Sequence, residues 1–477
     1  MELIGLTAAL AVMTGAGYAV LRAVAPERVS IHNTWEKLAF SYGLGMACVT
    51  VQFLVLGLLG AGLNLTLMIV PWVIALSAVT AVRKPEERYT DAGNRRPLPG
   101  AGRFMLGILL VQMFSVFVRA LVKPIESYDA IVNFAIKSKI MFLENGLRVS
   151  DTLFEGIGKG HRDYPLLIPA VQTWVYRFMG AHNDVLVKAV YPLVLVAFMV
   201  AVYTVLKRRF DARYGLLFAF ILGTMPQIVN YATIGYADLT FTFLVTTSFL
   251  MLLEYFRKNE KGALALSALF LGAGMLTKNE GISFLFSTVV VLGFFLYKKR
   301  GGGGHAGVMV KHFLLPLGII LVPWVLFKVR MDLPNTDIDL SGMSWARFME
   351  NAGHIPFILN KFQQELFQPK KWNIFWIMVT GFSVLRYKRL SNELVRLAGV
   401  FLLLNIGIYF CSYMVLTGKD LYFHVNTTMS RFMIHFSGTA LVYLALLMRK
   451  DIERIPFFRQ APARTGIQGQ ANRKASE

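Results

Sequence analysis

Acidic and basic side chains recur at the ends of apolar segments in this chain, where they could act together in one chemical site. Carboxylates and imidazoles can act as general bases or metal ligands, and Lys and Arg can bind a phosphate. A charge at the centre of a bilayer costs roughly 2.5–3.5 kcal/mol, so charges close to membrane segments are functional candidates by default. The candidates are Glu126, Asp129, His161, Asp163, Asp238, Lys278 and Arg431.

Each of these residues, taken alone, also has a plain structural explanation. Asp129 and Asp238 each precede a helical pattern and could be helix caps, and Asp163 before Tyr-Pro could shape a turn. Lys278 and Arg431 could extend toward water or lipid headgroups. The arrival of three acids and two bases at one face of the membrane favours the functional interpretation.

The elements that position these residues are transmembrane helices. Of the 477 residues, 55% are hydrophobic and only 16% are charged, whereas soluble domains are about 25% charged. The composition predicts an all-α polytopic membrane protein with about thirteen transmembrane helices. The two cysteines, Cys48 and Cys411, fall inside apolar runs and indicate neither a disulfide framework nor a thiolate metal site. The apolar runs are 3–21, 38–60, 65–82, 104–121, 185–206, 214–232, 239–256, 262–277, 282–297, 311–329, 372–385, 397–416 and 432–448.

The net charge of +21 reflects membrane topology and not nucleic-acid binding. By the positive-inside rule, the basic loops are cytoplasmic, which places the N-terminus outside and the C-terminus inside. The Lys and Arg residues concentrate in 22–37, 83–103, 207–213, 257–261, 298–311, 386–396 and the tail from Arg449.

One further apolar stretch, 164–180, does not fit this pattern as a transmembrane helix. If it crossed the membrane, the basic loop 207–213 and every later basic loop would move outside. We therefore expect it to lie at the interface or to enter and return. The resulting regions are 1–121 (four transmembrane helices), 122–184 (an external loop with interfacial helices), 185–329 (central transmembrane helices), 330–371 (a second external loop), 372–448 (C-terminal transmembrane helices) and 449–477 (a basic cytoplasmic tail).

Several stretches, in their order along the chain, resemble the GT-C superfamily of membrane glycosyltransferases that use polyprenyl-phosphate sugars. The most similar branch contains the protein O-mannosyltransferases and the bacterial lipid A aminoarabinose transferases. This resemblance implies a multi-pass enzyme of the inner (plasma) membrane with a glycan, lipid or protein acceptor. The stretches are SYDAIVNFAIKSKIMFLENG, HRDYPLLIPAVQTWVYRFMGAHNDVLVKAVYP, NYATIGYADLTFTF, GMLTKNEG and HVNTTMSRFMIHF.

The resemblance implies a role for each matching residue. Asp129 matches the first-loop acid that acts as general base on the acceptor hydroxyl. Lys278 and Arg431 would bind the donor phosphate, and attack opposite that phosphate predicts inversion at the anomeric carbon. Asp163 matches an acid near the metal or the acceptor, and Asp238 matches the acid that closes the next external hairpin. A divalent ion, if present, would be held by these two residues and Asp129.

Glu126 and His161 are further candidates for the acceptor or metal site. Two other functions stay open. A transporter or flippase for a lipid-linked glycan would also place charges in a membrane bundle, although we find no internal repeat of the kind that transporters often carry. An O-antigen ligase or polymerase would also act on prenyl-linked sugars outside the cell.

Overall fold

The computed structural model describes residues 1–24, 31, 33–82, 100–147, 161–298, 305–333, 344–415 and 420–455, and the regular elements in these ranges are all helical. In chain order they are α1 (Glu2–Val24), α2 (Thr34–Leu58), α3 (Leu65–Val82), α4 (Gly100–Val122), α5 (Tyr128–Ala130), η1 (Ile131–Ala135), α6 (Ile136–Leu143), α8 (Leu167–Met179), η2 (Leu186–Ala189), α9 (Val190–Arg209), α10 (Ala212–Thr224), α11 (Pro226–Tyr231), α12 (Asp238–Lys258), α13 (Lys261–Met275), α14 (Gly281–Lys298), α15 (His305–Met309), η3 (Val310–Leu314), α16 (Leu315–Arg330), α17 (Trp345–Glu350), η4 (Asn351–His354), α18 (Ile355–Leu366), α19 (Pro369–Trp372), α20 (Phe375–Leu385), η5 (Tyr387–Ser391), α21 (Glu393–Met414) and α22 (Leu421–Ile452).

The prediction of an all-α polytopic membrane protein is confirmed. Within the described ranges, ten helices are long and apolar enough to cross a membrane. Three shorter apolar helices, α10, α13 and α20, lie at the remaining predicted runs. The segment expected not to cross forms α8, which has 13 residues. At 1.5 Å per residue it is about 20 Å long, shorter than the ~30 Å hydrocarbon core.

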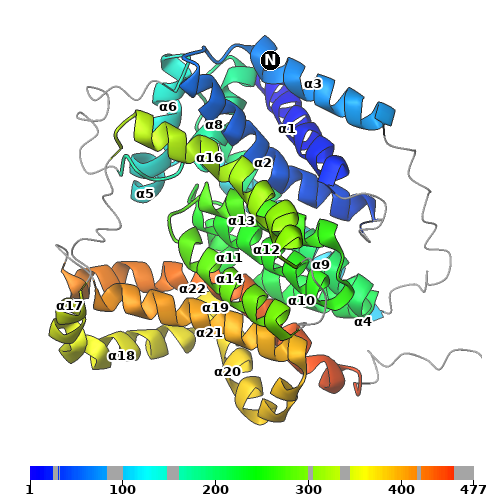
Figure 1. The fold of residues 1–477 in the computed structure, drawn as a ribbon, viewed down its shortest axis with the longest axis vertical. Helices are drawn as coiled ribbons and strands as arrows, with labels where there is room; N and C mark the ends of the chain where they lie inside the picture. The colour runs from blue at the N-terminus through cyan, green and yellow to red at the C-terminus, as the bar shows by residue number, and fades with distance from the viewer. Residues whose placement is uncertain are drawn as a thin grey trace, which may run out of the picture.

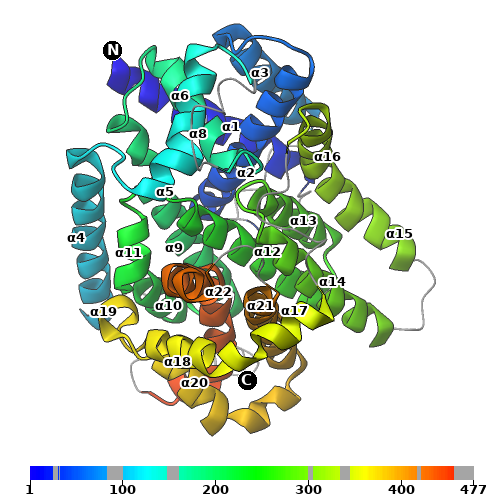
Figure 2. The same cartoon turned by 90° about the vertical axis from the view of Figure 1, so that its left-hand side faces the viewer.

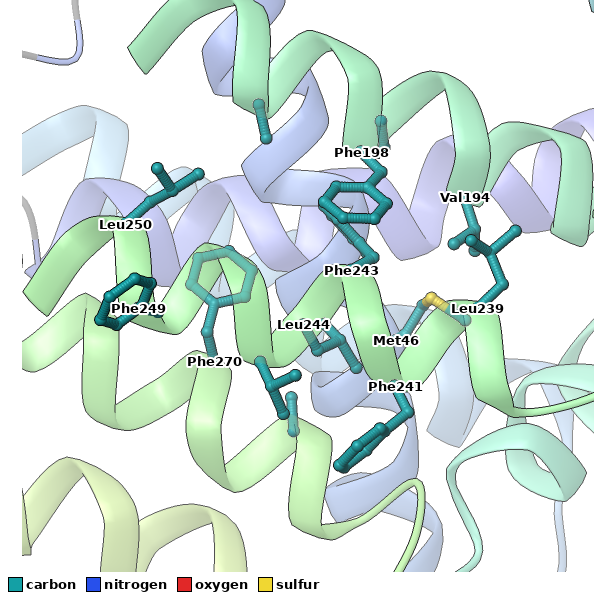
Figure 3. Packing of buried hydrophobic residues seen from close by; sticks show 14 of the residues in the cluster. Met46, Val194, Phe198, Leu239, Phe241, Phe243, Leu244, Phe249, Leu250 and Phe270 are labelled. Carbon is teal, nitrogen blue, oxygen red and sulfur yellow. The ribbon is translucent and has the colours of Figure 1, made fainter. Parts of the chain in front are cut away.

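Helix α12 lies at the centre of the bundle (Figures 1 and 2). It contacts α9, α13, α14, α21 and α22, and its most apolar window is buried along its whole length. Aromatic rings from neighbouring helices pack against α12. The centroid of the Phe243 ring lies 5.9 Å from that of Phe198 of α9 and 6.5 Å from that of Phe270 of α13 (Figure 3). A helix that is apolar on every side and surrounded by others serves as a rigid base for residues at its ends.

Helices α1 and α2 pack at the upper edge of the view in Figure 1, and glycines permit their close approach. A Cβ at Gly17 would lie 1.9 Å from the carbonyl oxygen of Ser41, and one at Gly45 would lie 2.1 Å from that of Met13. Small residues at helix contacts are typical of membrane proteins, where backbones approach closely to gain packing. By contrast, α3 is hardly buried, so its apolar surface is suited to lipid.

The first and last turns of α12 carry different charged residues. Helix α12 begins at Asp238 and has Arg257 in its last turn. Near that last turn, Arg257 binds Glu254 and Arg208 binds Glu36, each at 2.6 Å. Asp238 therefore lies at the end of α12 opposite to these two ion pairs.

Candidate active site

The carboxylate of Asp238 is the centre of a buried charge cluster. Its Oδ1 atom lies 3.0 Å from Nζ of Lys278, 3.3 Å from Nε of Arg431 and 2.9 Å from Nε2 of His435. The side chains of Asp238, Lys278 and His435 are almost fully buried. Buried charges are tolerated only when they are paired and hydrogen-bonded, and this cluster meets that condition.

Arg431 connects this cluster to a second carboxylate. Its Nη1 atom contacts Oδ2 of Asp129, and its guanidinium lies 5.3 Å from the centre of the Tyr236 ring. The Asp129 side chain is 29% exposed, whereas that of Asp238 is completely buried. Of the two carboxylates, only Asp129 is open to a reactant that arrives from outside the bundle.

The loop before Asp238 explains why the two acids are close together. Gly235 has φ of +85°, a left-handed conformation that favours glycine. A Cβ at this position would lie 3.5 Å from Cβ of Ala130, the residue after Asp129. The left-handed turn therefore directs the chain past the start of α5 and into the first turn of α12.

Lys278 is held by the tight turn between α13 and α14. Its backbone N–H donates to the Gly274 carbonyl at 3.1 Å, and the following Glu280 carboxylate lies 3.2 Å from its Nζ atom. Burial raises the pKa of Glu280, but the Lys278 ammonium, His435 and a backbone hydrogen bond together outweigh burial and lower that pKa below its ordinary value. The turn also accepts, at the Leu276 carbonyl, a 2.9 Å hydrogen bond from the N–H of Leu167 at the start of α8.

Two residues of this cluster were not predicted from the sequence. His435 contacts Asp238 through Nε2, and its Nδ1 atom lies 2.9 Å from the hydroxyl of Tyr409. The spacing of His435 from Arg431 could have identified it, since residues four apart share one face of a helix. Tyr409 carries no such signal, because it is one aromatic residue among many in an apolar helix.

The structure also describes the three remaining predicted residues, Glu126, His161 and Asp163. Glu126 has a side chain that is 60% exposed, and it forms an ion pair at 3.3 Å with Lys123. The His161 backbone contacts Asn133 and Lys137 of the η1–α6 helix, and its ring packs on Tyr164. Asp163 is buried in the turn before α8.

The described residues do not fit the predicted metal site. Asp129 and Asp238 both contact Arg431, a cation that occupies the space between two of the three expected ligands. In the described ranges, no three His, Cys, Asp or Glu side chains group closely enough to hold a metal ion. Asp163 therefore does not complete a three-acid set with the other two.

Helix capping does not explain Asp129 and Asp238, and extension toward water or lipid headgroups does not explain Lys278 and Arg431. The N-cap of α5 is Ser127 and that of α12 is Ala237, so neither Asp129 nor Asp238 occupies a cap position. Lys278 and Arg431 point to carboxylates within the protein.

Comparison with known proteins connects this geometry to a family. Residues 163–327 match the family model described as dolichyl-phosphate-mannose-protein mannosyltransferase. The match covers about a third of the chain and includes Asp238 and Lys278. The predicted resemblance to membrane glycosyltransferases of the GT-C type is confirmed over these residues. A search of curated proteins found no match, and a search of solved structures found none.

Proposed function

We propose that this protein is a membrane glycosyltransferase that moves a sugar from a polyprenyl-phosphate donor to an acceptor hydroxyl on the external face. The observation that supports this most directly is the position of Arg431, which contacts the partly exposed Asp129 and the buried Asp238 at once. In this proposal Asp129 is the general base, and it lies beside Arg431, which shares the Asp238 carboxylate with Lys278.

The donor phosphate would bind at Lys278 and Arg431. Both cations are held by Asp238, which orients them and keeps them in a site with little water. As the sugar–phosphate bond breaks, the leaving polyprenyl phosphate gains negative charge. Fixed cations stabilise that charge more in the transition state than in the ground state.

Phosphate binding would also prepare the base. Arg431 has one guanidinium for two carboxylates, so a phosphate that engages Nη1 competes directly with Asp129. Release of Asp129 would leave a carboxylate free to accept a proton. Donor binding and activation of the base are then the same event.

In the reaction, the acceptor oxygen attacks the anomeric carbon and its proton passes to Asp129. The new carbon–oxygen bond forms as the bond from that carbon to the phosphate oxygen breaks, and the phosphate leaves with the electron pair. Attack from the side opposite the phosphate inverts the anomeric configuration. No step in this scheme uses a metal ion, because the charges on Lys278 and Arg431 already supply electrostatic stabilisation.

We propose that this chemistry takes place outside the cytoplasm and that the protein lies in the inner membrane. The cluster lies at the end of α12 opposite to Arg257 and the other basic residues that the positive-inside rule assigns to the cytoplasm. The N-terminus would then be outside and the C-terminus inside, and the prenyl tail would remain in the lipid.

Purified protein in detergent, given a panel of polyprenyl-phosphate sugars with glycan, lipid and peptide acceptors, tests the proposal. We expect a covalent product from at least one donor, with inverted anomeric configuration by NMR. If well-folded protein makes no product from any donor but moves a lipid-linked glycan across proteoliposomes, the protein is a transporter. Product that needs a lipid-diphosphate glycan would instead indicate a ligase or polymerase.

A further inference from the structure

Helix α18 presents an uncharged polar groove at the same end of the bundle as the charge cluster. One side of α18 packs on α22, where Ile358 is buried with Val425 and Met429. The groove of about 440 Å³ runs along another side of the helix and is lined by Asn360, Gln363, Gln364, Phe367 and Gln368.

The composition of this groove is unusual for an exposed helix surface. Asn360, Gln363 and Gln364 are three or four residues apart and lie on one face of α18, and Phe367 and Gln368 follow the last residue of that helix. Four of the five are amides, and the fifth, Phe367, exposes 53% of its surface. An exposed helix face normally carries many Lys and Glu residues, yet none lines this groove.

The C-terminal end of the groove is rigid. Glu365 is buried and accepts hydrogen bonds from Lys371 at 2.9 Å and from the indole N–H of Trp372 at 3.3 Å. Trp372 is itself completely buried, and the amide of Asn373 donates to the Thr224 carbonyl at 2.9 Å. A groove fixed in this way loses little conformational entropy when a ligand binds.

The groove is built on the same elements as the charge cluster. Met429, which packs near Ile358, precedes Arg431 by two residues on α22. At the other end, α19 contacts α11, and the loop after α11 leads into Asp238. The side-chain amide of Gln227 in α11 donates a 2.8 Å hydrogen bond to the hydroxyl of Ser430 in α22, the residue before Arg431, and so connects α11 with α22.

The chemistry of the lining identifies a class of ligand. Each Asn or Gln amide can both donate and accept a hydrogen bond, which matches the paired hydroxyl groups of a sugar. An exposed aromatic ring offers an apolar surface for the C–H face of a sugar ring. The lining carries no charge to pair with a phosphate, a carboxylate or an ammonium group.

We propose that this groove binds an uncharged glycan chain and that the acceptor of the reaction is therefore a carbohydrate. This inference rests on the proposed transferase function. The growing end of the glycan would extend from the groove toward Asp129, and the amides of α18 would hold the sugar units behind it.

The test compares wild type with the Gln363→Ala/Gln364→Ala double variant and with Phe367→Ala. Leu359→Ala is a matched control, because Leu359 is exposed on the same helix but does not line the groove. The acceptors are neutral tetrasaccharides of glucose, galactose or mannose and a threonine-containing peptide, with the polyprenyl-phosphate sugar that gives product. Melting temperatures confirm that each variant is folded.

We expect transfer to a tetrasaccharide in wild type. In the groove variants the acceptor KM should rise roughly tenfold, with kcat, donor KM and donor hydrolysis by water unchanged. Leu359→Ala should behave as wild type. An acceptor KM that the groove variants leave unchanged would overturn the inference, as would a peptide acceptor whose KM responds to the same variants.

Calorimetric titration of the tetrasaccharides into protein without donor separates this inference from the proposed function. Binding that the groove variants abolish, in a protein that makes no product, would keep the glycan site and reject the transferase. Wild type that transfers sugar but neither binds nor uses any tetrasaccharide would keep the transferase and reject the glycan site.

Discussion

The guanidinium of Arg431 contacts the carboxylate of Asp129, although the two residues are far apart in the sequence. The same guanidinium binds Asp238, so one cation positions a partly exposed acid and a buried acid. This relationship separates two roles that carboxylates can take in one site. Asp238 holds cations, and in the proposed function Asp129, which is 29% exposed, serves the substrate.

The buried pair of Asp238 and Lys278 should show strong coupling in stability. Lys278→Met leaves Asp238 with one cation fewer, and loss of one partner of a buried ion pair typically costs about 3–5 kcal/mol. Combining it with Asp238→Asn should destabilise the protein by clearly less than the sum of the two single changes. Thermal unfolding of the four proteins in detergent measures this coupling, and purely additive effects would contradict the buried pair.

His435 should act as a positioning residue for Asp238 and Lys278. His435→Leu removes a hydrogen bond to a charged group, worth about 1.5–3 kcal/mol, so we expect kcat to fall roughly ten- to a hundredfold. His435→Gln retains an amide donor and should recover part of kcat. Steady-state kinetics with donor and acceptor varied separately checks this, and equal loss in the Leu and Gln variants at unchanged stability would argue against positioning.

Stability at acid pH should depend on Glu280. The pKa of this carboxyl is lowered in the folded protein, so its stabilising effect is present above the unfolded pKa and is lost as pH falls through the lowered folded value. We expect the melting temperature of wild type to fall on acidification into and below the ordinary carboxyl range, and to fall less in Glu280→Gln. Melting curves across this range test the sign, and a steeper loss in the variant would contradict it.

Removal of divalent ions should leave transfer intact. Lys278 and Arg431 supply the positive charge at the cluster, and Asp129 and Asp238 are both bound to Arg431. Activity is measured after EDTA treatment and again after Mg²⁺ or Mn²⁺ is restored. Activity that disappears with EDTA and returns with the ion would show that a metal takes part.

Much of this fold can be predicted from the sequence because the membrane restricts the chain to helices. The apolar runs coincide with helices, and the segment 164–180, which the charge rule predicts not to cross, forms the short helix α8. The same topology brings Asp129, Asp238, Lys278 and Arg431 to one end of the bundle, where they meet.

The sequence is less informative about which side chains at that end touch. Tyr409 comes from α21, whose rotation relative to α22 depends on packing that periodicity in an apolar helix does not reveal. His161 is predicted to share the depth of the cluster, and in the structure its carbonyl accepts a hydrogen bond from Lys137. Which side chains meet around the bundle depends on packing that the sequence does not reveal.

Sugar transfer by Asp129→Asn tests the central claim most directly. The variant should lose roughly 10²–10⁴-fold in kcat, because the amide cannot accept the acceptor proton, while binding of the polyprenyl-phosphate sugar persists. Glu126→Gln is the control, since Glu126 is exposed and forms an ion pair with its neighbour Lys123, and its activity should match wild type. An Asp129→Asn protein that binds the donor and transfers sugar at the wild-type rate would contradict the role of Asp129 as the base.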